Sequence, residues 1–165
     1  FAVDPASIAV YDGASGLRDA RRFRHAVPAH MNERGSARLA FGGRKVSTDW
    51  AVPYRRLADA IDTARRAADA HGVEQAVIYG HAGNGHPHQN FIAEDGDALR
   101  RINAVINETL HMVLQLGGTV AGEHGLGKLK RHWLHAQLSP AQLDVMRALK
   151  HALDPAGVCA PGNVL

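Results

Sequence analysis

Three histidines lie within a short glycine-rich segment near the middle of the chain. Residues 80–89 hold His81, His86 and His88 together with three glycines. A neutral imidazole nitrogen is a good donor to zinc and similar divalent ions, and glycine lets a backbone and a ligand approach each other closely. This density of histidine and glycine predicts a metal site that uses His81 and His88. His86 is either a third nitrogen ligand or a substrate contact, and the residues alone leave both open.

A further ligand must come from elsewhere in the chain, and Glu123 is the best candidate. It lies in the segment GEHGLG, residues 122–127, directly after a short apolar run. A carboxylate among glycines has little structural reason to be there. Two histidines plus one carboxylate, with a coordination position left open for water or substrate, form the pattern of catalytic rather than structural sites. Zinc is the first candidate for the ion, with manganese or iron as alternatives.

The elements that must position these segments follow in the order strand, helix, strand, strand, helix, strand. Alternating apolar positions and short β-branched or apolar runs predict strands, and apolar positions at helical spacing predict helices that end at glycine. The predicted strands are residues 46–52, 76–79, 90–93 and 119–121, and the predicted helices are residues 57–71 and 99–113. This order predicts an α+β fold of the ferredoxin-like, split βαβ type, in which helices pack on one face of an antiparallel sheet. The histidine-rich segment would then lie at the adjoining ends of two strands, where sites are common.

The two ends of the chain are less regular. Residues 1–45 are predicted to be irregular or partly helical, with one helix within residues 17–31, and residues 46–165 are predicted to form the core. A capping-box pattern predicts a final helix that begins at Ser139 and ends before Asp154. The glycine- and proline-rich tail that follows is predicted to be an irregular loop.

Composition places the chain among globular proteins of one domain, with 165 residues, of which 45% are hydrophobic and 21% charged. No apolar stretch approaches the roughly 18 residues of a membrane span. The single cysteine agrees with a reducing compartment, so a cytoplasmic location is expected. The net charge of +3 is spread along the chain and only 5% of residues are aromatic, which disfavours a nucleic-acid partner. The chain begins with Phe1 and without a signal pattern, and it is expected to be a piece of a longer protein.

The two chemistry-bearing segments and the tail resemble the C-terminal domain of FAD-linked oxidases of the vanillyl-alcohol oxidase superfamily, in its D-2-hydroxy-acid dehydrogenase branch. That branch includes D-lactate dehydrogenase, D-2-hydroxyglutarate dehydrogenase and the FAD subunit of glycolate oxidase. The family pattern is roughly GHxGDGNxHxN, then GEHGxG, then DPxGxxNPGK, and this chain reads GHAGNGHPHQN, GEHGLG and DPAGVCAPGN. The resemblance extends from about Arg18 to the C-terminus.

The resemblance implies a role for several residues when the family's functional positions are carried over one by one. The residues so assigned are, for the metal, His81, His88 and Glu123; for general-base catalysis, His124; for the substrate, Arg24, Asn90 and His86; and for the flavin, Asn84, Pro161 and Gly162. Among the substrate contacts, Arg24 would clamp a carboxylate, a task that the guanidinium fork suits.

The implied reaction is oxidation of a D-2-hydroxy acid to a 2-oxo acid. The metal holds and polarises the hydroxyl oxygen, the base takes a proton, and hydride passes to FAD. The implied partners are a small 2-hydroxy acid, an N-terminal FAD domain, an electron acceptor and, in a homodimer, a second copy of the chain. FAD would be bound mainly by that other domain, for which this chain has no room, so the chain alone is predicted to be inactive.

The chain departs from the family pattern at four positions. Asn84 and His86 replace the Asp and Asn of the first motif, and Ala160 and Asn163 replace the Asn and Lys of the last. These changes alter polar groups near the expected metal and flavin. Two other interpretations remain open: a self-contained metal-dependent hydrolase in which His124 activates water, and a non-catalytic ferredoxin-like module used for binding or assembly.

Overall fold

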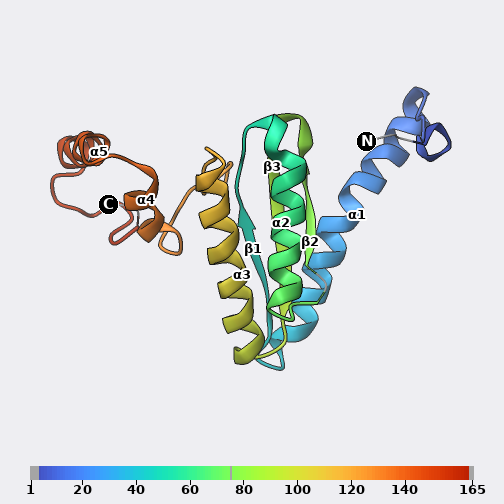
Figure 1. Ribbon diagram of the computed structural model, residues 1–165, viewed down its shortest axis with the longest axis horizontal. Coiled ribbons are helices and arrows are strands. Elements are labelled where there is room, and N and C mark those ends of the chain that lie inside the picture. Colours follow the sequence, from blue (N-terminus) through green and yellow to red (C-terminus); the bar gives the residue numbers. More distant parts are fainter. Residues whose placement is uncertain (1–3, 75, 164–165) are drawn as a thin grey trace.

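A three-stranded antiparallel sheet lies at the centre of the molecule in the computed structural model, which describes residues 4–74 and 76–163 (Figure 1). The strands are β1 (Arg44–Asp49), β2 (Val77–His81) and β3 (His86–Ala93). β3 lies between the other two and pairs with both in antiparallel fashion. The α+β class with an antiparallel sheet, predicted from the order of the elements, is therefore confirmed.

The predicted fourth strand, over residues 119–121, is reduced to an isolated bridge between Thr119 and Ala51. The next amide along the chain, that of Val120, donates a hydrogen bond to the side chain of Gln137 at 3.0 Å. The amides that follow bond a buried carboxylate, described below. The backbone amides after the bridge therefore donate to side chains, and the β-ladder does not extend beyond the bridge.

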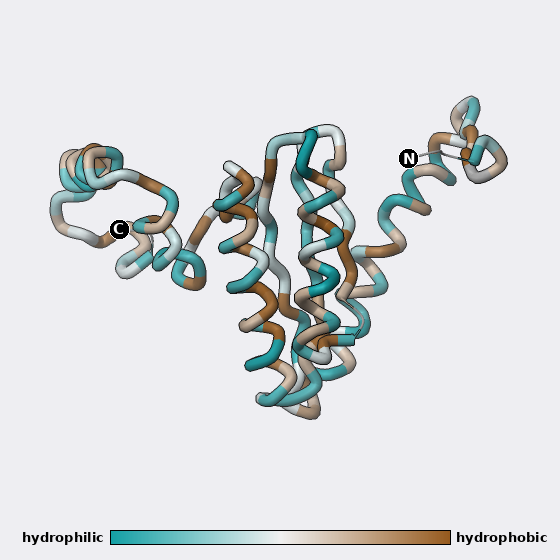
Figure 2. Tube along the Cα trace, in the orientation of Figure 1, coloured by the Kyte–Doolittle hydropathy of each residue, from teal (hydrophilic) through white to brown (hydrophobic). Residues whose placement is uncertain are grey.

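Helices α2 (Leu57–Ala70) and α3 (Gly96–Gln115) lie side by side over one face of the sheet (Figure 1). Hydrophobic and hydrophilic positions alternate along both helices, as expected of amphipathic helices (Figure 2). The buried residues of α2 are all alanines, which lets α3 approach closely. Phe91 of β3 is fully buried beneath them and packs with Ala67 of α2 and Ile102 of α3. Both predicted helices are confirmed to within a few residues.

Helix α1 (Gly13–Leu39) occupies most of residues 1–45, the part predicted to be irregular or partly helical. Its C-terminal third crosses the other face of the sheet, where a Cβ on Gly35 would lie 2.6 Å from that of Lys45. The rest of α1 projects away from the sheet (Figure 1). Only Met31 and Gly35 of this helix are buried, so its sequence carries no apolar period that would have predicted its full length.

The C-terminal part of the chain lies beside α3, away from α2 (Figure 1). It holds α4 (Leu134–Gln137) and α5 (Pro140–Leu153), and α5 begins with the predicted capping box between Ser139 and Gln142. The short 3₁₀ helices of the chain are η1 (Pro5–Ser7), η2 (Tyr54–Arg56), η3 (Ala82–Asn84) and η4 (Arg131–Trp133).

The tail after α5 is held by Asp154. Its carboxylate accepts hydrogen bonds from the amides of Val158 at 2.9 Å and Cys159 at 3.0 Å, and it pairs with Lys150. The hydrogen bond from Lys150, helped by the two amides, lowers the pKa of Asp154 although burial opposes the shift.

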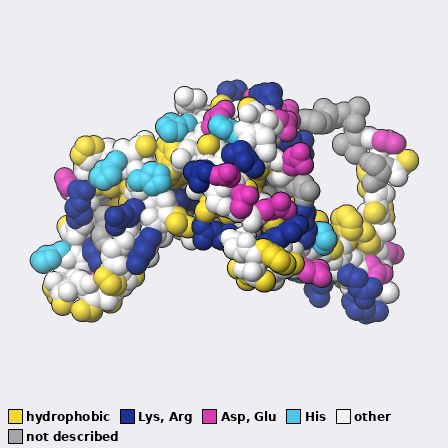
Figure 3. All heavy atoms as spheres, turned by 90° about the horizontal axis from the view of Figure 1, so that it is seen from below, with side chains coloured by type: hydrophobic (Ala, Val, Ile, Leu, Met, Phe, Trp, Pro, Cys, Tyr) yellow, Lys and Arg dark blue, Asp and Glu magenta, His cyan; other side chains and the backbone are white. Residues whose placement is uncertain are grey.

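The surface carries charges of both signs. On the face shown in Figure 3, Lys and Arg are spread along the whole molecule, and Asp and Glu lie among them at its centre. Among the described residues, no helix is both long and apolar enough to cross a membrane.

Candidate metal centre

Three imidazoles meet on one face of the sheet because of the strand register. His86 and His88 are two residues apart on β3, so both point to the same face, and His81 lies directly opposite His86 on β2. This face is the one opposite α2 and α3. The ring centroids lie 5.3 Å apart for His81 and His86, 5.5 Å for His81 and His88, and 4.7 Å for His86 and His88. The histidine-rich segment thus forms two strand ends and the turn between them, as predicted.

The turn depends on Gly85, which follows η3. Its φ is 64°, in the left-handed region, and a Cβ there would lie 2.1 Å from the carbonyl oxygen of Val52. Any residue with a side chain would be strained and would also clash with the backbone after β1. Gly85 therefore sets the register in which His81 faces His86.

Glu123 reaches the histidines from the loop after the Thr119 bridge. Its Oε1 lies 3.2 Å from Nε2 of His88 and 3.5 Å from Nε2 of His81. Bonds of about 2.0–2.1 Å to a tetrahedral zinc ion place neighbouring donors about 3.4 Å apart. One donor atom from each of His81, His86, His88 and Glu123 lies within 4.8 Å of the others. The structure therefore brings the three predicted ligands together, in a donor set that fits a divalent cation.

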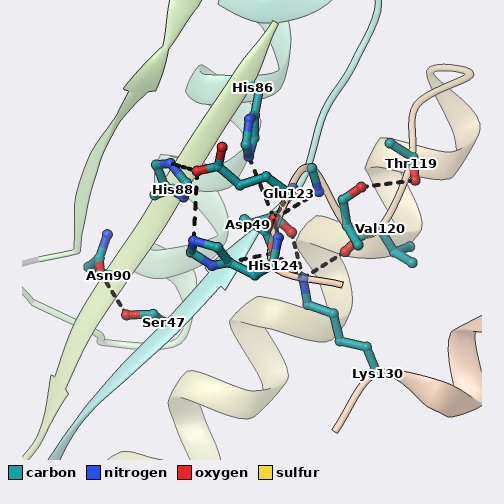
Figure 4. Close-up of polar contacts among 12 residues, drawn as sticks. Ser47, Asp49, His86, His88, Asn90, Thr119, Val120, Glu123, His124 and Lys130 are labelled. Atoms are coloured by element: carbon teal, nitrogen blue, oxygen red, sulfur yellow. Dashed lines mark hydrogen bonds and ion pairs between the residues drawn. The ribbon is translucent and has the colours of Figure 1, made fainter. Parts of the chain in front are cut away.

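Asp49, the last residue of β1, holds the loop that carries Glu123. One oxygen, Oδ2, accepts hydrogen bonds from the backbone amides of Gly122, Glu123 and His124 at 2.8, 2.7 and 3.0 Å (Figure 4). The other, Oδ1, accepts from Nζ of Lys130 at 3.0 Å. Burial by itself raises the pKa of Asp49, but these amides and the lysine outweigh it and bring the pKa below its usual range. A buried carboxylate anion thus fixes three consecutive backbone units of the loop.

Lys130 completes this anchor from the segment before η4. Besides the Asp49 carboxylate, its Nζ donates to the carbonyl oxygens of Asp49 at 2.5 Å and Val120 at 2.7 Å. Burial lowers the pKa of Lys130 more than its carboxylate partner raises it. The ammonium is therefore held in a buried position by three oxygens around it.

Gly122 allows the loop to close over the histidines. A Cβ at this position would lie 2.0 Å from Nε2 of His86. The imidazole belongs to β3, whose position is fixed because it pairs with a strand on each side. A side chain at position 122 would therefore displace the loop and not the strand. The glycine at the start of this segment is thus explained by close approach to a ring.

His124 stacks on His88, with ring centroids 5.0 Å apart and an angle of 22° between the planes. Its Nε2 lies 3.8 Å from Oε1 of Glu123 and its Nδ1 lies 3.9 Å from Oδ1 of Asp49. The side chain of His124 is about half exposed, whereas that of His88 is largely buried. Burial, together with the neighbouring imidazoles His86 and His124, lowers the pKa of His88 and favours the neutral form that binds metal.

A cavity of about 130 Å³ adjoins the imidazoles of His88 and His124. Its remaining wall is formed by Lys45, Ser47, Tyr79 and Asn90. The hydroxyl group of Ser47 donates to Oδ1 of Asn90 at 2.7 Å, whereas Nδ2 of Asn90 is buried with no hydrogen-bond partner among the described residues (Figure 4). The predicted substrate contact Asn90 therefore lies where a small ligand would reach both it and the histidines.

The other predicted site residues lie outside this group. Arg24 is exposed on α1, and its side chain makes no hydrogen bond or ion pair within residues 4–74 and 76–163. Asn84 is exposed at the end of η3. Pro161 and Gly162 are exposed in the tail, where the carbonyl oxygen of Gly162 accepts from Arg131 at 3.1 Å.

Sequence reasoning missed the anchoring residues. Asp49 was expected to lie in a strand that resembles a family motif and was given no role in the site, and nothing in its local sequence showed that three amides more than 70 positions away would bond to it. Lys130 lies in a segment without periodicity. The only local signal was the pair of glycine-rich segments, because such segments need contacts with other residues to keep one conformation.

Residues 6–164 match the family described as FAD linked oxidases, C-terminal domain. An FAD-linked oxidoreductase of Mycobacterium tuberculosis is 32% identical over 152 residues, which cover 84% of this chain and 32% of that protein. The glycolate oxidase subunit GlcD of Bacillus subtilis is 31% identical over 136 residues, 79% of this chain and 29% of that protein. The D-lactate dehydrogenase of Archaeoglobus fulgidus is 32% identical over 117 residues, 71% of this chain and 26% of that protein.

The chain thus spans a third or less of the length of these relatives. Their names agree with the D-2-hydroxy-acid branch that the motifs indicated. The family match over nearly all of the chain confirms the resemblance seen in its glycine- and histidine-rich segments. This protein chain belongs to the FAD-linked oxidases and is their C-terminal domain.

Proposed function

We propose that this chain is the substrate- and metal-binding part of a flavin-dependent dehydrogenase or oxidase that converts a D-2-hydroxy acid to a 2-oxo acid. The observation that carries the proposal is the meeting of His81, His88 and Glu123 next to His124 and a small polar cavity. Relatives named as a D-lactate dehydrogenase and as a glycolate oxidase subunit support the class of reaction. The activity would belong to the whole protein, together with its FAD-binding domain.

The cavity supports a small carboxylic acid as substrate. Lys45 supplies positive charge on its wall, and the buried Nδ2 of Asn90 can donate to a substrate oxygen. Arg24 remains a second candidate for the carboxylate, because an exposed guanidinium with no ion pair to a described residue is free to bind one. We assign Asn84, Pro161 and Gly162 to the surface that would face the flavin.

In the proposed reaction, the cofactors polarise the substrate and accept the hydride, and residues of the chain move the proton. A divalent cation on His81, His88 and Glu123 would polarise the substrate hydroxyl group, and FAD would accept the hydride. In our proposal, His124 takes the hydroxyl proton on a ring nitrogen beside the cavity. The carboxylates of Glu123 and Asp49, 3.8 and 3.9 Å from its two nitrogens, stabilise the imidazolium that results. The proton then leaves from the exposed side of the ring to water.

The test uses the full-length holoenzyme that contains this chain. Rapid mixing with D-2-hydroxy acids should bleach the oxidised flavin, and L-enantiomers should react far more slowly. His124→Asn should slow flavin reduction by about 10²–10⁴-fold, the usual contribution of a general base, with metal content retained. His135→Asn, at an exposed position on α4, serves as the control and should leave the rate unchanged. Failure of every D-2-hydroxy acid to reduce the flavin, or an unaltered rate in His124→Asn, would contradict the proposal.

A further inference from the structure

We infer that His86 is a fourth protein ligand of the metal centre, so that the ion is held by three imidazoles and one carboxylate and the substrate hydroxyl group would bind as a fifth ligand. The inference rests on the proposed metal site and extends it. The family pattern has Asn at this position, so the additional imidazole is a property of this chain rather than of the motif.

The sheet places His86 where a ligand is needed. It lies directly opposite His81 and two residues before His88, with ring centroids 5.3 and 4.7 Å away. Three imidazoles bound to one zinc ion through bonds of about 2.1 Å place their rings about 5 Å apart. A nitrogen of His86 also belongs to the group of donor atoms that lie within 4.8 Å of one another.

The Nε2 atom of His86 has no hydrogen-bond partner in the described part of the chain, although it is buried. The nearest carboxylate oxygen, Oδ2 of Asp49, is 3.6 Å away, which is too far for a good hydrogen bond, and it already accepts three backbone amides. A buried ring nitrogen without a partner is costly, and a cation would satisfy it.

The ring also cannot turn away from the site. Its side chain is 8% exposed, and Gly122 closes over it so tightly that a Cβ there would touch Nε2. The same loop delivers Glu123, so the contact that confines His86 also brings a carboxylate oxygen within 4.8 Å of one of its ring nitrogens.

A site of this composition has a distinct preference among ions. Imidazole suits zinc, cobalt, nickel and copper, whereas manganese and magnesium prefer oxygen ligands. The centre should therefore discriminate against manganese more strongly than a site with two imidazoles, and that discrimination should depend on His86.

The experiment measures metal binding by the purified full chain and three variants, with zinc, cobalt and manganese as the probes and chelator competition as the readout. His86→Asn restores the family residue, His88→Asn removes an expected ligand, and His135→Asn is the surface control. We expect His86→Asn to weaken zinc binding by at least about 100-fold, to weaken manganese binding much less, and to change the visible spectrum of the cobalt form. X-ray absorption of the zinc form of the unaltered chain should count three imidazoles.

The outcomes separate the two proposals. Loss of metal in His88→Asn, with affinity and cobalt spectrum unchanged in His86→Asn, would overturn the fourth ligand and leave the proposed function intact. Absence of stoichiometric metal in the unaltered chain would overturn both. If His86→Asn does not fold, the X-ray absorption result decides, because a count of two imidazoles also overturns the inference.

Discussion

At the scale of single residues, Asp49 does most to position the candidate site. It contributes no atom to the proposed ligand set, yet it bonds the amides of residues 122–124 and pairs with Lys130. Its side chain is 2% exposed and that of Lys130 is 12% exposed, so the pair is shielded from water. Removing one member of such a pair leaves an uncompensated buried charge.

Replacement Asp49→Asn should therefore lower the free energy of unfolding by about 3–5 kcal/mol, the range for breaking a buried ion pair. It should also weaken zinc binding, because the single acceptor oxygen of asparagine cannot serve both the loop amides and Lys130, which bond different oxygens of Asp49. Urea denaturation and chelator competition measure the two effects. The matched control is Asp144→Asn on α5, whose ion pair with Arg147 is exposed and should be worth less than about 1 kcal/mol. Equal stabilities of the two variants would contradict the anchoring role.

Gly122→Ala tests the close approach to His86. The added Cβ cannot be accommodated 2.0 Å from Nε2, so the loop must shift and draw Glu123 away from the histidines. We expect weaker zinc binding, by about 10–100-fold if the effect resembles other losses of support around a metal. Gly83→Ala, in η3, is the control, since no described atom lies within 4 Å of the position that its Cβ would take. Unchanged zinc affinity in Gly122→Ala would show that the loop is not set by this contact.

At the scale of elements, β3 and α1 differ in how many of their side chains contact the rest of the chain. β3 carries the histidines of the candidate site on one face and core residues such as Phe91 on the other. One face of the strand therefore forms the site and the other stabilises the fold. α1 buries only Met31 and Gly35, and its exposed apolar side chains include Leu17 and Phe23. A helix that buries so little gains little from packing on this chain.

The capping box of α5 gives a prediction at this scale. Ser139 and Gln142 bond each other's backbone amides, and the Ser139 hydroxyl group also donates to Oε1 of Gln142 at 3.0 Å, so Ser139→Ala removes two of these three hydrogen bonds. The loss should be about 1 kcal/mol and should be local, seen as faster amide exchange in the first turn of α5. Ser36→Ala, at an exposed position within α1, should leave exchange in α5 unchanged. Exchange that speeds up equally along the whole of α5 would argue against a local role of the cap.

At the scale of the whole molecule, an α+β core lies between two less integrated ends (Figure 1). Two carboxylates fix the C-terminal half through hydrogen bonds to backbone amides. Asp49 bonds the loop after α3 to the end of β1, and Asp154 bonds the tail to the end of α5. Both carboxylates have a lowered pKa. The folded state therefore binds fewer protons than the unfolded chain when the pH falls below the usual pKa of aspartate.

Stability should consequently depend on acid. The contribution of these two groups is fully present above about pH 4, the pKa range of aspartate in unfolded chains, and is lost as the pH falls through the lower values of the folded state. The free energy of unfolding, measured by urea denaturation at about pH 6 and about pH 3, should decrease on acidification. Asp49→Asn and Asp154→Asn should each flatten this dependence, whereas Asp144→Asn should retain it. A variant of Asp49 with the original pH slope would refute the assignment.

Local patterns in the sequence predicted the residue types of the candidate site and the helices that bury an apolar face. His81, His88 and Glu123 were predicted as ligands from their types and glycine-rich surroundings, and α2, α3 and α5 from apolar period and caps, because these signals are local. The tertiary structure shows which residues meet: donor atoms of His81, His86, His88 and Glu123 lie within 4.8 Å of one another, and Asp49 bonds the amides of a loop 73 positions away. Register and loop closure set such contacts, and neither leaves a local pattern. The same reason explains α1, whose few buried residues give the sequence no period to show.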